Sequence, residues 1–197
     1  MEGSPGAPER RLFVVRHGQT ERSAAHVYSG QADVPLTDAG REQARLAGER
    51  LAGAGVDAIW SSPLVRAGDT AEAIAKATGA EVTIDERLIE VDYGELEGFD
   101  RDKARTHFGQ AFEDWRSDPY NSPLPGMEPL AEALARAREV TADAIACSRR
   151  PVMVGHQGIL RLVLVAVGEV EADAYFSVRL SEAEPVEIAD PVVVPAA

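Results

Sequence analysis

The stretch Leu12-Phe13-Val14-Val15-Arg16-His17-Gly18-Gln19-Thr20 decides how the rest of this sequence is read. Its first four residues are apolar and favour β-structure. We therefore predict a buried strand over about residues 11–16, ending at a tight turn at Gly18. In α/β sheets, ligands bind at the carboxyl ends of such strands. Arg16 offers a planar fork of donors that suits phosphate or carboxylate, and neutral His17 can act as nucleophile, base or metal ligand. Taken alone, His17 fits a solvent-facing loop residue equally well.

The remaining pattern alternates strands with helices, which predicts an α/β fold. We expect a three-layer α/β/α sandwich with a mostly parallel central sheet and a small lid insertion. Thr37 is a typical helix N-cap, and Ser62-Pro63 is a typical helix start that places Arg66 in the first turn. Expected helices cover about residues 38–51, 62–78, 127–148 and 159–167, with mixed helical structure over 100–115. Further strands are expected at 57–61, 81–84, 151–154, 175–180 and 186–188.

Length and composition indicate one globular domain. The chain has 197 residues, of which 45% are hydrophobic. We expect a flexible lead-in over residues 1–10, a single domain over 11–190 with the lid at about 99–126, and a tail over 191–197. With a single cysteine, Cys147, the chain cannot form an intrachain disulfide or a multi-thiolate metal site.

The charge balance restricts the partners. A formal net charge of −13 argues against nucleic acid or an anionic membrane as the main partner. Residues 1–9 lack the apolar core of a signal peptide, and no apolar run reaches the roughly 18 residues that a spanning helix needs. We expect a cytoplasmic protein. The sequence leaves open whether it forms a homodimer.

A second histidine stands in a position similar to that of His17. The predicted strand at 151–154 runs into Gly155-His156-Gln157-Gly158, so both histidines follow strand ends that share one edge of a parallel sheet. Arg66 also follows a strand end, and so does the acidic loop that contains Glu90. Two histidines, two arginines and a carboxylate at one edge form a compact anion site.

Three other kinds of site fit less well. Two arginines would repel a metal cation bound by the histidines. A Gly-x-Ser-x-Gly elbow of a serine hydrolase is missing, and so are the glycine-rich fingerprints of dinucleotide and P-loop sites. Covalent catalysis by an imidazole on a phosphoryl group remains.

Five segments in order resemble the histidine phosphatase superfamily, the phosphoglycerate-mutase-like phosphatases, over about residues 11–180. They are Arg16-His17-Gly18-Gln19-Thr20, Gly30-x-x-Asp33-x-Pro35-Leu36-Thr37-x-x-Gly40, Ser61-Ser62-Pro63-Leu64-x-Arg66-Ala67-x-x-Thr70-Ala71, Leu88-x-Glu90-x-x-x-Gly94-x-x-Glu97-Gly98 and Val154-Gly155-His156-x-Gly158.

This resemblance implies a role for each residue of the site. His17 is the implied nucleophile, which forms a phosphohistidine by in-line attack. Arg16, Arg66 and His156 are the implied holders of the phosphoryl oxygens, and Glu90 is the implied proton donor and later proton acceptor. Asp92 and Glu95 lie in the same acidic loop and are the alternatives to Glu90. The resemblance implies no cofactor and no metal.

Weaker matches extend the set of candidates. The implied pocket wall consists of Gln19, Thr20, Ser23, Ser29, Gly30 and Gln157. A second contact to an anionic group in the lid could come from any of four arginines, and the sequence does not choose among them: Arg22, Arg101, Arg105 and Arg116. Trp115 is expected to pack under the lid, and His26 and His107 are expected to be solvated loop residues.

The resemblance implies a metal-independent phosphatase that hydrolyses small phosphorylated metabolites. Phosphoglycerate mutases of the family have adjacent arginines after a lid tryptophan, and they usually have asparagine where Ser23 and Gly158 stand here. These departures favour a phosphatase over the alternative, a cofactor-dependent phosphoglycerate mutase. A non-catalytic module that binds a phosphorylated ligand is the second alternative.

Overall fold

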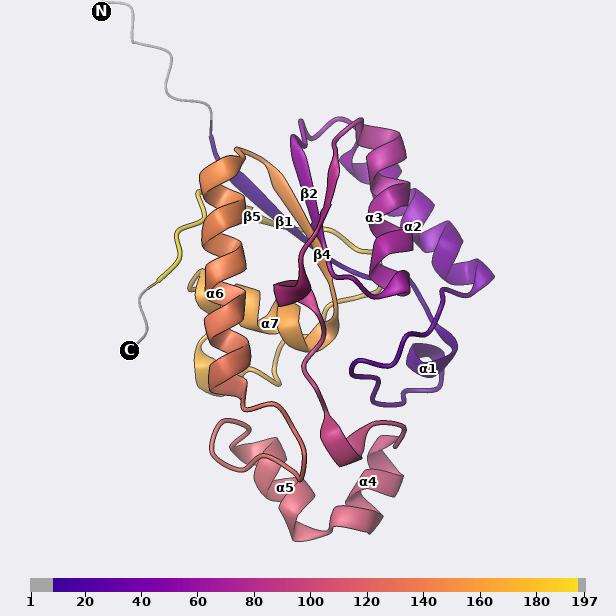
Figure 1. Cartoon of the computed structure of the whole chain (residues 1–197), viewed down its shortest axis with the longest axis vertical. Coiled ribbons are helices and arrows are strands. Elements are labelled where there is room, and N and C mark those ends of the chain that lie inside the picture. Colours follow the sequence, from indigo (N-terminus) through magenta and orange to yellow (C-terminus); the bar gives the residue numbers. More distant parts are fainter. Residues whose placement is uncertain (1–8, 195–197) are drawn as a thin grey trace, which may run out of the picture.

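The computed structural model describes residues 9–194 and consists of a central five-stranded sheet covered by helices on both faces (Figure 1). The strand order is β3-β2-β4-β1-β5. All neighbouring strands are parallel except β1 and β5, which are antiparallel. The strands are β1 (Arg11–Arg16), β2 (Ala58–Ser61), β3 (Val82–Ile84), β4 (Pro151–Gly155) and β5 (Val186–Ala189). The predicted α/β/α sandwich with a mostly parallel sheet is therefore confirmed.

Seven α-helices and three 3-10 turns complete the described part of the chain. The helices are α1 (Glu21–Ala24), α2 (Asp38–Leu51), α3 (Val65–Thr78), α4 (Arg101–Phe108), α5 (Gln110–Ser117), α6 (Leu130–Cys147) and α7 (Gln157–Ala166). The 3-10 turns are η1 (Glu86–Leu88), η2 (Gly94–Leu96) and η3 (Ala172–Ala174). No described helix has the length and apolar character needed to cross a membrane.

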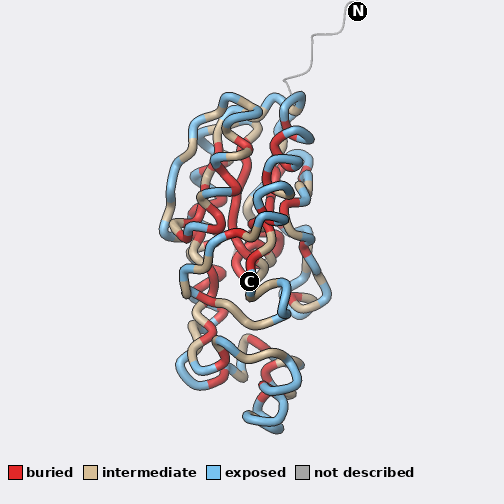
Figure 2. The backbone as a smooth tube through the Cα atoms, turned by 90° about the vertical axis from the view of Figure 1, so that its right-hand side faces the viewer, coloured by how far each residue is buried: buried red, intermediate tan, exposed pale blue. Residues whose placement is uncertain are grey.

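Alternation along β1 explains its continuous apolar run. Leu12 and Val14 pack into the core beneath α6 and α7, whereas Phe13 and Val15 pack into the core beneath α2 and α3. Both faces of the strand are buried over residues 12–15, so each of these four positions is apolar. Figure 2 shows the same division, with buried backbone through the middle of the sandwich and exposed backbone around it. The burial of β1 fixes where the chain must leave the sheet, at Arg16.

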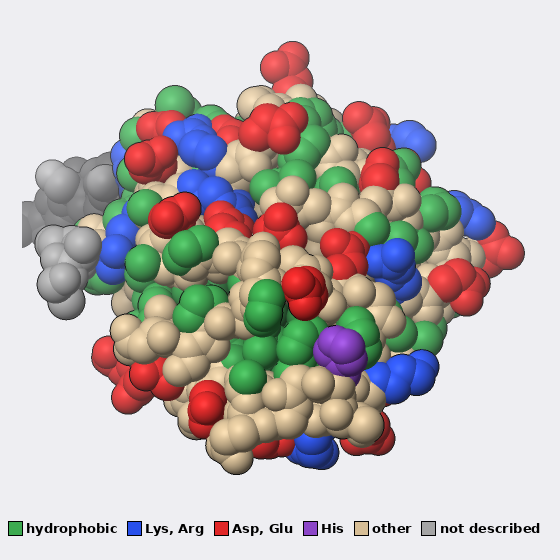
Figure 3. Space-filling model, turned by 60° about the horizontal axis from the view of Figure 1, so that its bottom comes forward, with side chains coloured by type: hydrophobic (Ala, Val, Ile, Leu, Met, Phe, Trp, Pro, Cys, Tyr) green, Lys and Arg blue, Asp and Glu red, His purple; other side chains and the backbone are tan. Residues whose placement is uncertain are grey.

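The segment from α4 through α5 to residue 126 projects beyond the carboxyl ends of the central strands (Figure 1). We call residues 99–126 the lid. Trp115 of α5 is buried on the inner side of the lid, with its ring centroid 5.9 Å from that of Tyr28 and 5.0 Å from that of Phe176. The expected packing role of Trp115 is therefore confirmed. Seen from the lid end, acidic and basic side chains alternate around a central group of hydrophobic ones (Figure 3).

The strand predicted over residues 175–180 is wrong. The backbone after η3 turns back on itself, and its polar groups bond to side chains instead of a neighbouring strand. The Val178 carbonyl accepts hydrogen bonds from Arg161 and Gln157, and the Leu180 N–H donates to Gln157. Its apolar residues are buried (Tyr175, Leu180) or half-buried (Phe176, Val178) against the core, which produces a strand-like pattern without a ladder.

Several boundaries differ from the predicted ones. Helix α3 begins at Val65 and not at Ser62, because the Ser62 hydroxyl faces His156 and caps only the turn at Leu64. Helix α6 begins at Leu130, directly after Pro129, and α7 begins at Gln157. The loop after Gly18 contains the unpredicted helix α1, which a capping box of Thr20 and Ser23 initiates.

The structure describes only parts of the predicted lead-in and of the predicted tail. Residues 1–8 of the lead-in and 195–197 of the tail lie outside the described residues. Arg10 is held by the Ile145 carbonyl at 2.6 Å, and the Val194 N–H donates to Ala166 at 2.8 Å. The described parts of both ends are thus attached to the domain.

Candidate active site

Pairing of β1 with β4 brings the two histidines together. Arg16 lies opposite Gly155 in the parallel register, so His17 and His156 leave the sheet side by side. Their ring centroids lie 5.1 Å apart, and the His17 N–H donates to the Gly155 carbonyl at 2.9 Å. The two strand ends therefore bring the histidine rings next to each other.

Hydrogen bonding defines the protonation of His17. Its Nδ1 lies 2.7 Å from the carbonyl oxygen of Gly18, which can only accept, so Nδ1 holds the proton. Nε2 is then left with a free lone pair. Burial, followed by the charges of Arg16 and Arg66, lowers the His17 pKa to about 3. The imidazole is therefore neutral, and able to act as a nucleophile, across the physiological pH range.

Close backbone packing explains the glycine after His17. A Cβ on Gly18 would stand 2.4 Å from the carbonyl oxygen of Gly40, and a Cβ on Gly40 would stand 2.1 Å from that of Gln19. The two glycines thus let the loop after β1 contact the first turn of α2. The Gly18 N–H donates to the Thr70 hydroxyl on α3 at 3.1 Å, which holds the turn in place from the other side.

Arg66 is fully buried although it is charged. Its Nη1 and Nη2 donate to the carbonyls of Ala32 and Gly30 at 2.7 and 2.8 Å, and its Nε donates to His156 Nδ1 at 3.1 Å. Burial lowers the pKa of this guanidinium below its ordinary value. Gly30, predicted as a wall residue, instead anchors Arg66 through its carbonyl.

His156 is neutral in the opposite tautomer from His17. Because the Arg66 Nε–H can only donate, Nδ1 of His156 must accept, and Nε2–H donates to the Ser62 hydroxyl at 2.7 Å. The ring is buried, and burial together with Arg66 holds its pKa well below the usual range. The two histidines thus present one free ring nitrogen between them, Nε2 of His17.

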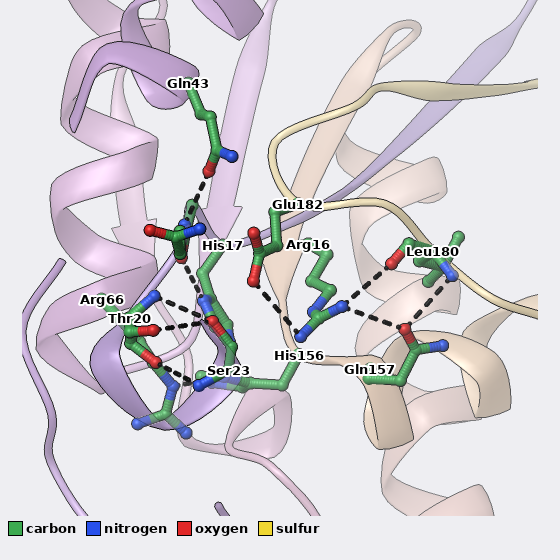
Figure 4. Close-up of polar contacts among 12 residues, drawn as sticks. Arg16, His17, Thr20, Ser23, Gln43, Arg66, His156, Gln157, Leu180 and Glu182 are labelled. Carbon is green, nitrogen blue, oxygen red and sulfur yellow. Dashed lines mark hydrogen bonds and ion pairs between the residues drawn. The ribbon is translucent and has the colours of Figure 1, made fainter. Parts of the chain in front are cut away.

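Arg16 is oriented from the side opposite to His17 (Figure 4). Its Nη1 donates to the Leu180 carbonyl at 3.1 Å and to Gln157 Oε1 at 3.5 Å, and its Nη2 lies 3.8 Å from Glu182 Oε1. Leu180 and Glu182 belong to the segment that was mispredicted as a strand and the turn after it. The sequence analysis missed Glu182, because no motif marks it.

Glu90 is held by the amino end of α7. Its Oε1 accepts the N–H groups of Val91 and Ile159, both at 2.8 Å, and its Oε2 accepts the Gly158 N–H at 2.9 Å. Oε2 is therefore the oxygen with spare hydrogen-bonding capacity. Glu90 lines the cavity beside His17, whereas Asp92 caps the turn at Gly94 and Glu95 is exposed.

These side chains face a cavity of about 350 Å³. Of the predicted wall residues, Thr20, Ser23, Ser29 and Gln157 line this cavity, together with Arg16, His17, Arg66 and Glu90. His156 is not part of the cavity wall, and both of its ring nitrogens are bonded, to Arg66 and to Ser62. Gln19 does not line it, because its side chain carbonyl accepts from the Thr37 hydroxyl at 3.0 Å. The buried Ser29 hydroxyl has no hydrogen-bond partner among the described residues.

One of the four arginines considered for a second anionic contact lines the cavity. Arg116 lines the cavity, whereas Arg22 pairs with Glu97 and Arg105 pairs with Glu113. Arg101 is exposed and is not part of the cavity wall. Missed wall residues, which no motif marks, are His26, Val27, Tyr28, Tyr93, Arg161, Phe176 and Arg179.

The remaining two histidines match their prediction only in part. His26 is exposed in the loop after α1, as expected, and it also contributes to the cavity mouth. His107 is exposed but lies on α4 and not in a loop. No cluster of three or more metal-ligating side chains occurs within residues 9–194.

Comparison with known proteins agrees with this geometry. A model of the histidine phosphatase superfamily (branch 1) matches residues 12–189. A Hydrogenobacter thermophilus protein assigned as phosphoserine phosphatase 2 is 31% identical over 91% of this chain and 89% of its own. A Salmonella protein assigned as the phosphoglycerate mutase GpmB is 36% identical over 74% of this chain and 69% of its own. A mycobacterial glucosyl-3-phosphoglycerate phosphatase, solved in complex with VO3, superposes with a TM-score of 0.82 at 30% identity and covers 90% of each chain.

Proposed function

Because the chain belongs to the histidine phosphatase superfamily, we propose that it hydrolyses small phosphomonoesters through a phosphohistidine on His17. The observation that carries this proposal is the free, neutral Nε2 of His17 beside the buried Arg66 and the half-buried Arg16. A neutral imidazole with its other nitrogen bonded to the Gly18 carbonyl is an oriented nucleophile. The guanidinium groups of Arg16 and Arg66 supply charge that stabilises a transferring phosphoryl group.

In the first step, Nε2 attacks phosphorus and the bond from phosphorus to the leaving oxygen breaks. Glu90 donates a proton from Oε2 to that oxygen, and the alcohol departs. The positive charge that develops on the phosphorylated ring is stabilised by the Gly18 carbonyl, which accepts from Nδ1–H. In the second step, Glu90 takes a proton from water, the water oxygen bonds to phosphorus, and the bond to Nε2 breaks. Phosphate and neutral His17 are restored, so the atoms balance over the cycle.

Labelling with a phosphorylated substrate tests the mechanism. Brief incubation with a ³²P-labelled monoester should label the protein in an acid-labile, base-stable bond, and His17→Ala should abolish both labelling and hydrolysis of 4-nitrophenyl phosphate. The matched control is His107→Ala, an exposed histidine on α4 that should leave both unchanged. Labelling that persists in His17→Ala would overturn the proposal. Added chelator should not alter the rate, because the proposed steps use no metal.

The relative assigned as a phosphoglycerate mutase supports a second candidate function. Incubation with 3-phosphoglycerate separates the two activities, since a mutase forms the isomer faster than it releases phosphate. A binding module without catalysis would instead bind phosphate tightly and fail to hydrolyse 4-nitrophenyl phosphate. Glu90, which would transfer the proton to a leaving alkoxide, lies in the cavity beside His17 and favours an enzyme over a binding module. We favour the phosphatase over the mutase because Ser23 and Gly158 stand where the mutases of the family usually have asparagine.

A further inference from the structure

A charged pair outside the cavity has no part in the reaction derived above. Arg136 of α6 forms a bidentate ion pair with Glu128, in which Nε donates to Oε1 at 2.7 Å and Nη2 donates to Oε2 at 2.8 Å. Only 17% and 18% of the two side chains is exposed, and neither residue lines the cavity. Removing two charges from water is costly unless further hydrogen bonds use their remaining donors and acceptors. The other bonds of the pair therefore show what it holds.

Arg136 holds the chain on the amino side of Glu90. Its Nη1 donates to the carbonyls of Arg87 and Ile89, both at 2.7 Å. Arg87 lies in the 3-10 turn η1, and Ile89 directly follows that turn. The Ile89 carbonyl belongs to the peptide group that joins Ile89 to Glu90. The guanidinium group thus fixes the peptide plane from which the catalytic residue leaves.

Glu128 holds the chain on the carboxyl side of Glu90. Its Oε2 accepts from the Asp92 N–H at 3.2 Å, and its own N–H donates to the Asp92 carbonyl at 2.9 Å. Glu128 stands two residues after the end of the lid. The pair therefore joins the chain around Glu90 to α6 and to the segment that leaves the lid.

This stretch of chain depends on such bonds because residues 89–93 lie outside every helix and strand of the described chain. The Glu90 carboxylate accepts from the amino end of α7, through the N–H groups of Gly158 and Ile159. Those bonds orient the carboxylate, and the Arg136–Glu128 pair holds the backbone that carries it. A general acid transfers its proton only within hydrogen-bond distance of the leaving oxygen, so a small displacement of this backbone matters.

We propose that Arg136 and Glu128 are positioning residues, which hold the backbone on both sides of Glu90 so that its carboxylate reaches the leaving oxygen. This inference rests on the proposed function, in which Glu90 donates the proton. Loss of the pair should impair proton transfer to the leaving group. It should spare phosphate binding, because Arg16 and Arg66 are held by other carbonyls, those of Leu180 and Gly30.

The basicity of the leaving group separates this role from a general structural one. Phenyl phosphate and 4-nitrophenyl phosphate are similar in shape, but phenolate is the more basic leaving group and gains more from a proton donor. The ratio kcat/KM reports the steps up to loss of the leaving group. Glu90→Gln, which removes the proton donor, should therefore lower kcat/KM more for phenyl phosphate than for 4-nitrophenyl phosphate.

The pair variants should show the same selectivity. We expect the double variant Arg136→Met/Glu128→Gln, which leaves no buried charge unpaired, to lose roughly fivefold more kcat/KM on phenyl phosphate than on 4-nitrophenyl phosphate. Glu128→Gln alone changes the shape least and should show a smaller loss of the same kind. The inhibition constant of inorganic phosphate should stay within about twofold of the wild type.

Asp143→Asn is the matched control. It removes a second ion pair between α6 and η1, in which Asp143 Oδ2 lies 2.8 Å from Arg87 Nη1, without touching the backbone beside Glu90. It should affect both substrates equally. An equal loss on both substrates in the pair variants, or a selective loss in Asp143→Asn, would overturn the inference.

Amide hydrogen exchange gives a readout that needs no activity. The N–H groups of Gly158 and Ile159 donate to the Glu90 carboxylate, whereas the next one, of Leu160, donates to the His156 carbonyl at 3.0 Å. Displacement of Glu90 in the pair variants should speed exchange at Gly158 and Ile159 roughly tenfold and leave Leu160 unchanged. Unchanged exchange at the first two amides would overturn the inference.

The two sets of results separate this inference from the proposed function. If Glu90→Gln is selective and the pair variants are not, the function stands and the positioning role is refuted. If the wild type hydrolyses neither substrate, the function is refuted, and amide exchange alone decides whether the pair positions Glu90.

Discussion

Gly158 donates its backbone N–H to Oε2 of Glu90 at 2.9 Å, and a Cβ on this glycine would stand only 2.6 Å from Oε1. The absence of a side chain at the first turn of α7 is therefore what allows the Glu90 carboxylate to lie against the helix. The same Cβ would stand 2.8 Å from the Tyr93 hydroxyl, so a side chain at position 158 would collide with both Glu90 and Tyr93.

Gly158→Ala should displace Glu90 and lower kcat roughly 100-fold, in the range expected for loss of a general acid. Inhibition by inorganic phosphate should change little, because the arginines and His17 stay in place. Gly68→Ala is the matched control: its Cβ enters open space on α3, and it should keep full activity while stabilising the helix by up to about 1 kcal/mol. A Gly158→Ala enzyme with wild-type kcat would exclude Glu90 as the proton donor.

The buried, neutral state of His17 predicts a specific loss of stability in acid. Its pKa is about 3 in the folded protein against roughly 6.5 when unfolded. Between these values the unfolded state binds a proton that the folded state does not. Protonation of His17 in the unfolded state therefore has no effect on stability above about pH 6.5. As the pH falls from there toward 3, it lowers the free energy of unfolding by roughly 1.4 kcal/mol per pH unit.

Urea unfolding of the wild type and of His17→Gln at several pH values checks this slope. The free energy of unfolding of the wild type should fall relative to that of the variant as the pH drops from 6.5 to 4.5. Parallel curves for the two proteins would show that His17 is protonated in the fold. His26→Gln, at an exposed histidine, should run parallel to the wild type.

Glu182 should weaken the binding of phosphate. Its carboxylate lies 3.8 Å from Arg16 Nη2 and reduces the positive potential that an anion meets there. Arg16 stays oriented without it, through the Leu180 carbonyl and Gln157. Glu182→Gln should therefore lower the inhibition constant of inorganic phosphate several-fold at low salt. Glu184→Gln, which removes an exposed carboxylate paired with Arg50, should not; weaker inhibition in Glu182→Gln would mean that Glu182 positions Arg16 instead.

Ser62 should hold the His156 ring. Its hydroxyl is the only acceptor for Nε2–H among the described residues, and both groups are buried. Ser62→Ala leaves a buried donor unsatisfied, at a cost of about 1–3 kcal/mol of stability, and lets the ring rotate away from Arg66. We expect a lower melting temperature together with a lower kcat. Ser61→Ala removes only a bond to the Ser62 carbonyl and should reduce kcat less; equal kcat in both variants would contradict the role of Ser62.

Local pattern was sufficient for most of the fold and for the centre of the site. The apolar run before Arg16 predicts a strand that is buried on both faces, and the glycine after His17 predicts a turn. The same kind of pattern failed at residues 175–180, where the apolar residues are buried or half-buried against the core. Periodicity reports which side chains are buried, but it does not report whether the backbone between them bonds to another strand.

The sequence by itself determined the architecture, because buried strands, turn glycines and helix caps are local signals, and its motifs indicated the candidate catalytic residues. Only the tertiary structure decided the protonation of His156, since Arg66 and Ser62 approach its ring from a distant part of the chain. It also decided which arginines reach the cavity. Arg161 and Arg179 have no motif, and they meet Arg116 only because the segment after η3 packs Phe176 beneath the lid. Such contacts join residues far apart in the chain, and no short-range pattern records them.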